Sequence, residues 1–311
     1  MSLKVVFMGT PEFAVPIVKL LNDSYEVVGV VTQPDKMVGR KKIMTPPPVK
    51  VVSEELGLKV FQPRHIKEEY QPILDLKPDL IVTCAYGQIL PEEILNYPKY
   101  GCINVHASLL PKLRGGAPIH HAIIDGYKET GITIMYMSKK MDQGDILTQV
   151  KTEIRDDDTL GTLQYKLSEM AKDLLKATIP LLIDKKIVPL KQKEEEATYG
   201  YNISREEEKI DFSKSTIDIF NQIRGLNPWP GAYTTLDGVI VKIYNARISD
   251  SFFTTRKDGE IGKVYSDGIG VSTHDGEIII TELQFAGKRK MSVKEYFNGV
   301  DKESLIGKVF E

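Results

Sequence analysis

Residues 102–119 have the sequence CINVHASLLPKLRGGAPI, in which an apolar run passes into a polar loop and then into a second apolar stretch. The run from Cys102 to His106 predicts a short buried strand. Turn-forming residues dominate 108–116, and the stretch from Ala117 to Asp125 predicts a helix that ends at Gly126. A strand, a loop and a helix in this order are the building unit of α/β folds.

Four further apolar runs predict strands of the same sheet: Lys4–Gly9, Tyr25–Val31, Leu80–Ala85 and Ile132–Met137. Continuous Val and Ile runs are typical of strands covered on both faces, and therefore of a mainly parallel, Rossmann-like sheet with helices on both sides. Pro11–Leu21 and a longer stretch that starts near Thr159 have helical spacing. We expect one α/β catalytic domain over residues 1–190.

The composition changes after residue 190. Residues 191–207 are polar and include Glu194–Glu196, which predicts a solvated linker. Beyond the linker, Asp-Gly pairs that favour tight turns occur at positions 237, 258, 267 and 275. The segments between them include the strand-like runs 239–244, 270–273 and 277–283. This pattern predicts a small antiparallel, OB-like β-barrel domain over residues 208–311.

The bulk composition is that of a globular protein. Of 311 residues, 41 % are hydrophobic and 27 % charged, and the formal net charge of -2 argues against a protein that coats nucleic acid non-specifically. No apolar run approaches the length of a membrane span, and the N-terminus has no signal-peptide pattern. The two cysteines, Cys84 and Cys102, lie in apolar runs and predict buried thiols in a reducing compartment. We expect a cytoplasmic monomer.

Asn104 and His106 are candidate site residues because they share one face of a strand near its C-terminal end, where α/β sheets bind ligands. An amide beside an imidazole can donate hydrogen bonds to a developing oxyanion. A lone histidine is more often a structural residue, so a third group is needed, and Asp142 and Asp145 are equal candidates from spacing alone. His120 and His121 are interpreted as ordinary helix residues, and no His/Cys/Asp/Glu cluster predicts a metal site.

The motif Asn-x-His-x-Ser-Leu-Leu-Pro from residue 104, followed by Arg-Gly-x-x-Pro-Ile and by Asp-x-Gly from residue 142, resembles the formyltetrahydrofolate-dependent formyltransferases. The resemblance implies that Asn104, His106 and Asp142 are catalytic, and it selects Asp142 over Asp145. It implies 10-formyltetrahydrofolate as co-substrate, without a metal. The residues that it places near the folate are Tyr86, Gly87, Gln88, Ile89, Leu90, Ser108, Leu109, Leu110 and Pro111.

A basic loop after the second strand, from Gln33 to Lys50, resembles that of the family members that formylate methionyl-initiator tRNA for translation initiation. We expect a flexible loop whose positive side chains pair with phosphates, and the resemblance implies tRNA contacts for Arg40, Lys41 and Lys42. Met37-Val38 departs from the Pro-Ala pair common in that group. The C-terminal domain would also hold tRNA, with Lys288, Arg289 and Lys290 as its one evident basic cluster.

Four other functions remain open at this point. Formyltransferases that act on an amino-sugar nucleotide share both motifs, but the basic loop favours tRNA. A glycinamide-ribonucleotide transformylase would lack the C-terminal barrel, and a formyltetrahydrofolate hydrolase would use the same three side chains. A non-catalytic RNA-binding protein built on an OB module is disfavoured by the intact Asn104, His106 and Asp142 set.

Overall fold

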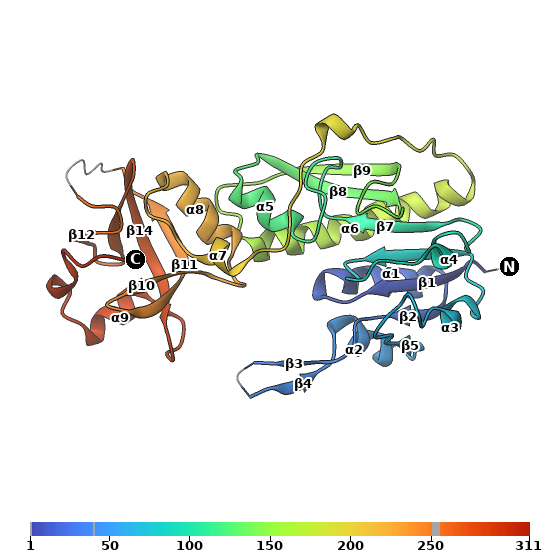
Figure 1. Cartoon of the computed structure of the whole chain (residues 1–311), viewed down its shortest axis with the longest axis horizontal. Coiled ribbons are helices and arrows are strands. Elements are labelled where there is room, and N and C mark those ends of the chain that lie inside the picture. The colour runs from blue at the N-terminus through green and yellow to red at the C-terminus, as the bar shows by residue number, and fades with distance from the viewer. Residues whose placement is uncertain (1, 40, 251–255) are drawn as a thin grey trace. The chain divides into compact units, whose positions relative to one another are not determined.

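The structure is a computed structural model that describes residues 2–39, 41–250 and 256–311 (Figure 1). The chain forms two compact units, which are described separately. The first unit contains Met1–Pro118, Glu129–Glu153 and Gln164–Tyr201. The second contains Ile119–Lys128, Ile154–Leu163 and Asn202–Glu311.

The first unit is built on a seven-stranded sheet in the order β5-β2-β1-β6-β7-β8-β9. Its strands are β1 (Lys4–Gly9), β2 (Glu26–Val31), β5 (Val60–Phe61), β6 (Leu80–Cys84), β7 (Cys102–His106), β8 (Glu129–Tyr136) and β9 (Ile146–Glu153). The five strands from β5 to β7 pair in parallel, whereas β8 pairs antiparallel with both β7 and β9. The predicted mainly parallel sheet is confirmed.

The strands nearest the middle of this sheet are fully covered, as their apolar runs predict. Every residue of β6 is buried, including Cys84, and Cys102 at the start of β7 is buried as well. Both thiols are free, and burial raises the pKa of each to about 12. The long helix α6 (Leu160–Ile183) buries Leu163, Leu167 and Leu175 completely, on the face that their spacing predicts.

The remaining helices are mostly short. They are α1 (Val15–Ser24), α2 (Pro48–Glu55), α3 (Gln71–Leu74), α4 (Glu92–Leu95), α5 (Pro118–Ile124), α7 (Arg205–Glu208), α8 (Thr216–Gly225) and α9 (Val293–Tyr296), with 3-10 turns at Glu12–Ala14, Glu194–Glu196, Phe297–Gly299 and Glu303–Leu305. Within the described residues, none of the helices has both the length and the apolar character needed to cross a membrane.

The segment expected to be a long flexible loop contains a β-hairpin instead. Strand β3 (Lys36–Val38) pairs antiparallel with β4 (Ile43–Thr45), and the side chains of both strands are exposed. At the base of the hairpin, Asp35 accepts hydrogen bonds from Lys50 Nζ and Gln62 Nε2. Sequence patterns miss this hairpin because neither face is buried, so no apolar alternation marks its strands.

The second unit contains a six-stranded antiparallel sheet. Strands β10 (Ala232–Leu236), β11 (Val239–Ile248), β14 (Gly276–Phe285), β13 (Ile269–Thr273) and β12 (Ile261–Val264) follow in this spatial order, and β15 (Met291–Ser292) pairs with β14. Asp237 and Gly238 between β10 and β11 have φ of 50° and 75°, as a two-residue type I′ turn requires. The predicted C-terminal β domain is therefore confirmed.

The last residues of the chain join the two ends of this sheet. Phe310 forms a bridge with Leu236 at the end of β10, and Val309 forms one with Glu260, next to β12. Glu311 exchanges two backbone hydrogen bonds of 2.9 Å with Thr235. The C-terminal segment thus closes the sheet along both outer strands.

Candidate active site

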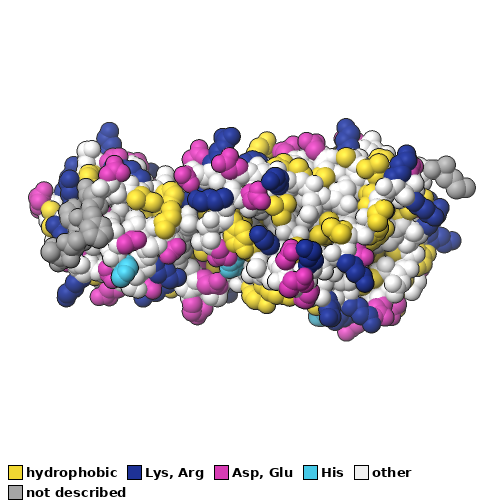
Figure 2. Space-filling model, turned by 90° about the horizontal axis from the view of Figure 1, so that it is seen from above, with side chains coloured by type: hydrophobic (Ala, Val, Ile, Leu, Met, Phe, Trp, Pro, Cys, Tyr) yellow, Lys and Arg dark blue, Asp and Glu magenta, His cyan; other side chains and the backbone are white. Residues whose placement is uncertain are grey.

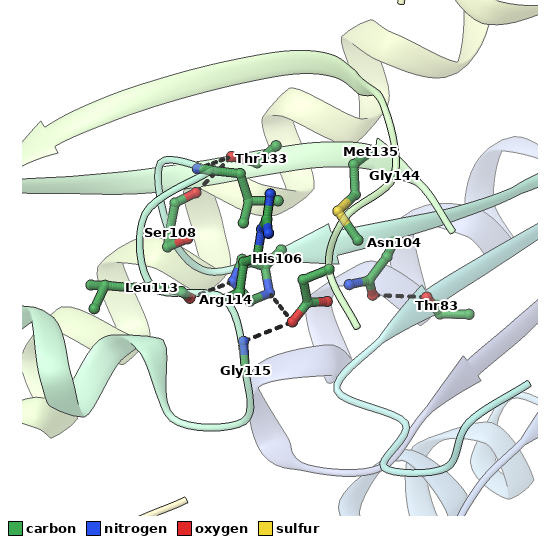
Figure 3. A network of polar contacts seen from close by, with 12 residues as sticks. Thr83, Asn104, His106, Ser108, Leu113, Arg114, Gly115, Thr133, Met135 and Gly144 are labelled. Atoms are coloured by element: carbon green, nitrogen blue, oxygen red, sulfur yellow. Dashed lines mark hydrogen bonds and ion pairs between the residues drawn. The ribbon is translucent and has the colours of Figure 1, made fainter. Parts of the chain in front are cut away.

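The candidate site lies where two neighbouring parallel strands end. Thr83 on β6 is in register with Asn104 on β7, and His106 follows Asn104 on the same face (Figure 3). His106 is buried, with 6 % of its surface exposed, whereas Asn104 is partly exposed. Carboxyl ends of parallel strands are the usual ligand sites of α/β sheets.

The amide of Asn104 is oriented by Thr83. The Thr83 hydroxyl donates to Asn104 Oδ1 across 2.8 Å (Figure 3). Because Oδ1 is used in this contact, the Asn104 Nδ2 group remains as a hydrogen-bond donor. Thr83 itself is 2 % exposed, and the sequence pattern did not identify it as a site residue.

The backbone carbonyl of Leu113 sets the tautomer of His106. His106 Nε2 lies 2.9 Å from the Leu113 oxygen, and a carbonyl can only accept, so Nε2 must carry a proton (Figure 3). The other ring nitrogen, Nδ1, lies 3.7 Å from Asp142 Oδ2. That separation is too long for a direct hydrogen bond between the two groups. Nδ1 is therefore the nitrogen available for proton exchange.

Asp142 lies in the loop between β8 and β9 and has a left-handed backbone conformation, with φ of 52°. Its Oδ2 accepts a 2.8 Å hydrogen bond from the Gly115 backbone N–H, which fixes the carboxylate beside His106. Asp145 instead contributes its backbone oxygen to a bond with Tyr136 N. The structure thus places the carboxylate of Asp142 beside His106.

The Ser108–Pro111 segment is held by side chains that the sequence analysis missed. Thr133 Oγ1 donates to the Ser108 oxygen at 2.6 Å and accepts from Leu110 N at 3.1 Å. Gln149 Nε2 donates to the Leu110 oxygen at 2.9 Å. Thr133 and Gln149 come from β8 and β9, and nothing in their local sequence distinguishes them from other strand residues.

The Tyr86–Leu90 segment follows β6, so it leaves the sheet at the same edge as the Asn104 strand end. Tyr86 and Leu90 are buried, whereas Ile89 is 67 % exposed. Gln88 is tied down, since its Oε1 accepts from Ile66 N at 2.9 Å. Among the described residues, the backbone N–H groups from Gly87 to Leu90 have no hydrogen-bond partner. The segment offers backbone donors and one exposed apolar side chain to a ligand.

His120 and His121 do not join this group of side chains. Burial is the main cause that lowers the pKa of His120 to about 4; His121 adds to the shift, and a backbone hydrogen bond involving Trp229 opposes it. His121 Nδ1 lies 3.5 Å from Asp125 Oδ2. Within the described residues, no three His, Cys, Asp or Glu side chains are grouped so that they could hold a metal ion.

The basic residues predicted to contact tRNA differ in whether they form ion pairs with acidic side chains. Lys41 and Lys42 are exposed between β3 and β4, and Arg40 lies outside the described residues. In the second unit, Arg289 pairs with Glu295 at 2.9 Å and Lys290 with Glu282 at 3.1 Å. On the face shown in Figure 2, Lys and Arg side chains alternate with Asp and Glu instead of gathering in one field.

Both parts of the chain match known protein families. Residues 3–179 match the family model described as "Formyl transferase", and residues 202–301 match "Formyl transferase, C-terminal domain". A relative named methionyl-tRNA formyltransferase, from Bacillus cereus (strain B4264), is 56 % identical over 305 residues, which are 97 % of each chain.

Two solved structures share the fold. The structure of HypX from Aquifex aeolicus in complex with tetrahydrofolic acid has a TM-score of 0.65 at 17 % identity, over 96 % of this chain and 47 % of that one. An N-formyltransferase from Helicobacter canadensis, in complex with folinic acid and dTDP-3-aminofucose, has a TM-score of 0.66 at 21 % identity, over 89 % of this chain and 98 % of that one.

Proposed function

The chain belongs to the formyl transferase family, and we propose that it transfers a formyl group from 10-formyltetrahydrofolate to the α-amino group of methionyl-initiator tRNA. The observation that carries this proposal is the meeting of Asn104, His106 and Asp142 at the carboxyl end of β7. The near-complete match to a methionyl-tRNA formyltransferase supports the choice of acceptor.

The residues near the site suit a formyl-folate. Bound there, 10-formyltetrahydrofolate would supply a formyl group on a nitrogen leaving group. The unpartnered backbone N–H groups from Gly87 to Leu90 can meet the polar edge of a pterin ring, and exposed Ile89 can cover apolar ring surface. We propose Tyr86–Leu90 and Ser108–Pro111 as the two folate-binding segments.

Asn104 and His106 are proposed to stabilise the negative charge that develops on the formyl oxygen. Thr83 leaves Asn104 Nδ2 as a donor, and His106 is the second donor in the state in which Nδ1 carries a proton in addition to Nε2. Both groups are held in place before the reaction, so no reorganisation is needed when the charge appears. Losing one such donor typically costs about 3 kcal/mol of transition-state stabilisation, roughly a hundredfold in rate.

Asp142 is proposed to take the proton that the attacking amine must lose. As the amine nitrogen bonds to the formyl carbon, its proton passes to Asp142 Oδ2, directly or through water. Asp142 then returns this proton, directly or through water, to the folate nitrogen as the bond between that nitrogen and the formyl carbon breaks, which regenerates the carboxylate. Asp142 Oδ2 and His106 Nδ1 lie 3.7 Å apart, so neither atom is committed to a direct hydrogen bond with the other.

The β3–β4 hairpin is proposed to contact the acceptor end of the tRNA, through Lys41, Lys42 and Arg40. We propose residues 1–190 as the catalytic domain, 191–207 as the linker, whose first part up to Tyr201 belongs to the first compact unit, and 208–311 as an OB-like domain that adds tRNA contacts, including Lys288, Arg289 and Lys290. We also propose that the protein acts as a monomer in the cytoplasm, where its free cysteines would stay reduced.

The test is a formylation assay with 10-formyltetrahydrofolate and charged initiator tRNA. We expect N-formylmethionyl-tRNA as the product. We expect Asn104→Ala, His106→Ala and Asp142→Asn each to lower kcat by about a hundredfold while folate affinity changes little. A dTDP-amino sugar serves as the competing acceptor, and formate release without a formylated product would indicate a hydrolase. Either outcome, without formylmethionyl-tRNA, would overturn the proposed acceptor.

A further inference from the structure

The segment Lys191–Tyr201 packs against the candidate active site, although most of its side chains are exposed. We call it the strap. Thr198 Oγ1 accepts from Leu113 N at 2.9 Å, and the backbone of Arg114 exchanges hydrogen bonds with Thr198 and Gly200. The strap therefore pairs with the loop that carries Leu113, the residue whose carbonyl binds His106.

Gln192 is the strap residue that reaches the Asp142 loop. Its Nε2 donates to the backbone oxygens of Asp142 and Gly144, both at 2.8 Å. Its Oε1 accepts from Arg114 Nε at 3.0 Å. Both donors and the acceptor of one amide are thus used, and they join the Asp142 loop to the Arg114 loop.

The Asp142 loop needs such support because its backbone is constrained. Asp142 has a left-handed conformation, which costs a non-glycine residue on the order of 1 kcal/mol. A Cβ atom on Gly144 would lie 1.7 Å from the Tyr136 oxygen, so the loop runs in direct contact with the end of β8. Gln192 binds the carbonyls on both sides of this turn and so opposes its relaxation.

Arg114 orients Gln192 from the other side. The Arg114 side chain is fully buried, and its Nη1 contacts both carboxylate oxygens of Glu194, at 2.9 and 3.0 Å. The Arg114 guanidinium can only donate hydrogen bonds, so the oxygen of the Gln192 amide must face it. The flipped orientation would place the Gln192 NH₂ group against another donor. The Gln192 Nε2 group therefore faces the Asp142 loop.

We propose that Gln192 is a positioning residue for formyl transfer, which holds the Asp142 carboxylate at His106 by fixing the backbone of residues 142–144. This inference rests on the proposed function for its kinetic consequence. Gln192 does not touch the reacting atoms; it acts through Asp142. A misplacement of a catalytic group by about 1 Å can cost up to a hundredfold in rate.

A double-mutant cycle tests this inference. Gln192→Met keeps the length of the side chain and removes all three hydrogen bonds, and Gln192→Glu keeps the acceptor for Arg114 while removing the two donors. We expect both variants to lower kcat about tenfold or more, with KM for both substrates changed less than about threefold. In an Asp142→Asn background, Gln192→Met should cost less than about twofold, because Gln192 acts through that carboxylate.

Gln222→Met is the matched control. Like Gln192, which is partly buried, Gln222 donates from its Nε2 to two backbone oxygens, those of Glu207 at 2.7 Å and Lys209 at 3.0 Å, and Gln222 is itself buried. We expect this variant to lower the unfolding temperature while kcat is retained. An unchanged kcat in Gln192→Met, or an equal loss in the Asp142→Asn background, would overturn the inference.

Hydrogen exchange separates this inference from the proposed acceptor. Gln192→Met should speed amide exchange in a peptide that spans residues 138–147, and Gln222→Met should leave that peptide unchanged. If the unmodified chain forms no formylmethionyl-tRNA, the acceptor proposal fails while the exchange result still decides whether Gln192 holds the loop. Unchanged exchange in Gln192→Met would refute the inference in either case.

Discussion

The Thr83 hydroxyl donates a 2.8 Å hydrogen bond to Asn104 Oδ1 from the neighbouring parallel strand. Because Oδ1 accepts this hydrogen bond, the Nδ2 group of the Asn104 amide faces the proposed substrate site. We expect Thr83→Val to lower kcat by about threefold to tenfold, because the amide can then turn its oxygen toward the formyl oxygen. Thr83→Ser should restore most of the rate.

Steady-state formylation kinetics check this expectation. The matched control is Thr234→Val, since Thr234 is also fully buried and donates to the Glu311 oxygen in the second unit. The control should retain kcat. Equal rates for Thr83→Val and the unmodified protein would mean that Asn104 is oriented by other contacts.

Gly115→Ala should disturb both the Asp142 contact and the strap. Gly115 has φ of 114°, and a Cβ atom there would lie 2.7 Å from the Gly200 oxygen. Its N–H is the group that binds Asp142 Oδ2. We expect a fall in kcat of tenfold or more together with a loss of about 1–2 kcal/mol in the free energy of unfolding.

Gly57→Ala separates these two effects of the Gly115 change. Gly57 also has a positive φ, of 71°, but no atom lies within 4 Å of its added Cβ. This variant should lose about 1 kcal/mol of stability while kcat stays unchanged. Denaturant unfolding and formylation kinetics provide the comparison, and a fully active Gly115→Ala variant would contradict the contact between Gly115 and Asp142.

Burial of His120 should make the protein less stable in mild acid. Its pKa is lowered to about 4 in the folded chain, whereas an unfolded histidine titrates near 6.5. Between these two pKa values the unfolded state binds the proton more tightly than the folded state. The free energy of unfolding is therefore highest above about pH 6.5 and falls as the pH decreases to 4. By pH 4.5 the loss should reach about 2–3 kcal/mol.

His120→Gln removes this titration. Urea unfolding followed by circular dichroism at several pH values should show a flatter pH dependence in the variant. Parallel curves for the variant and the unmodified protein would contradict the expected titration of His120.

The exposed hairpin lysines should govern tRNA use and its salt dependence. Replacing Lys41 and Lys42 by Ala should raise KM for methionyl-tRNA and leave KM for the folate unchanged. The slope of log kcat/KM against log salt should become shallower by about 1–2, since each phosphate contact contributes roughly one unit. The double replacement of Lys67 and Lys176, which are also exposed, is the charge-matched control. Equal salt slopes for the two double variants would exclude the hairpin contact.

Much of the fold could be predicted because its signals are local. The apolar run of β1 and the Asp-Gly turn after β10 each predict the element found there. Strand β9 was missed because only its first two residues are buried, and the remaining residues, which alternate between partly buried and exposed, are mostly polar. The antiparallel direction of β8 was not predicted either, since an apolar run has no marker of chain direction.

The residues of the candidate site likewise include some that local sequence predicts and some that it does not. Asn104 and His106 could be proposed from their spacing on one strand, and Asp142 from a motif. Gln192 lies 50 residues from Asp142 in the chain, inside a polar segment whose composition resembles that of any solvated linker. Its contact depends on tertiary packing, which no local pattern of charge or hydropathy encodes.

The bridges made by Val309 and Phe310 have a consequence for self-association. They occupy the outer edges beside β10 and β12, where unpaired backbone groups would otherwise face solvent. Loss of these last residues would leave two strand edges able to pair with the edge of another molecule. By covering these edges, the C-terminal segment should disfavour edge-to-edge aggregation of the β domain.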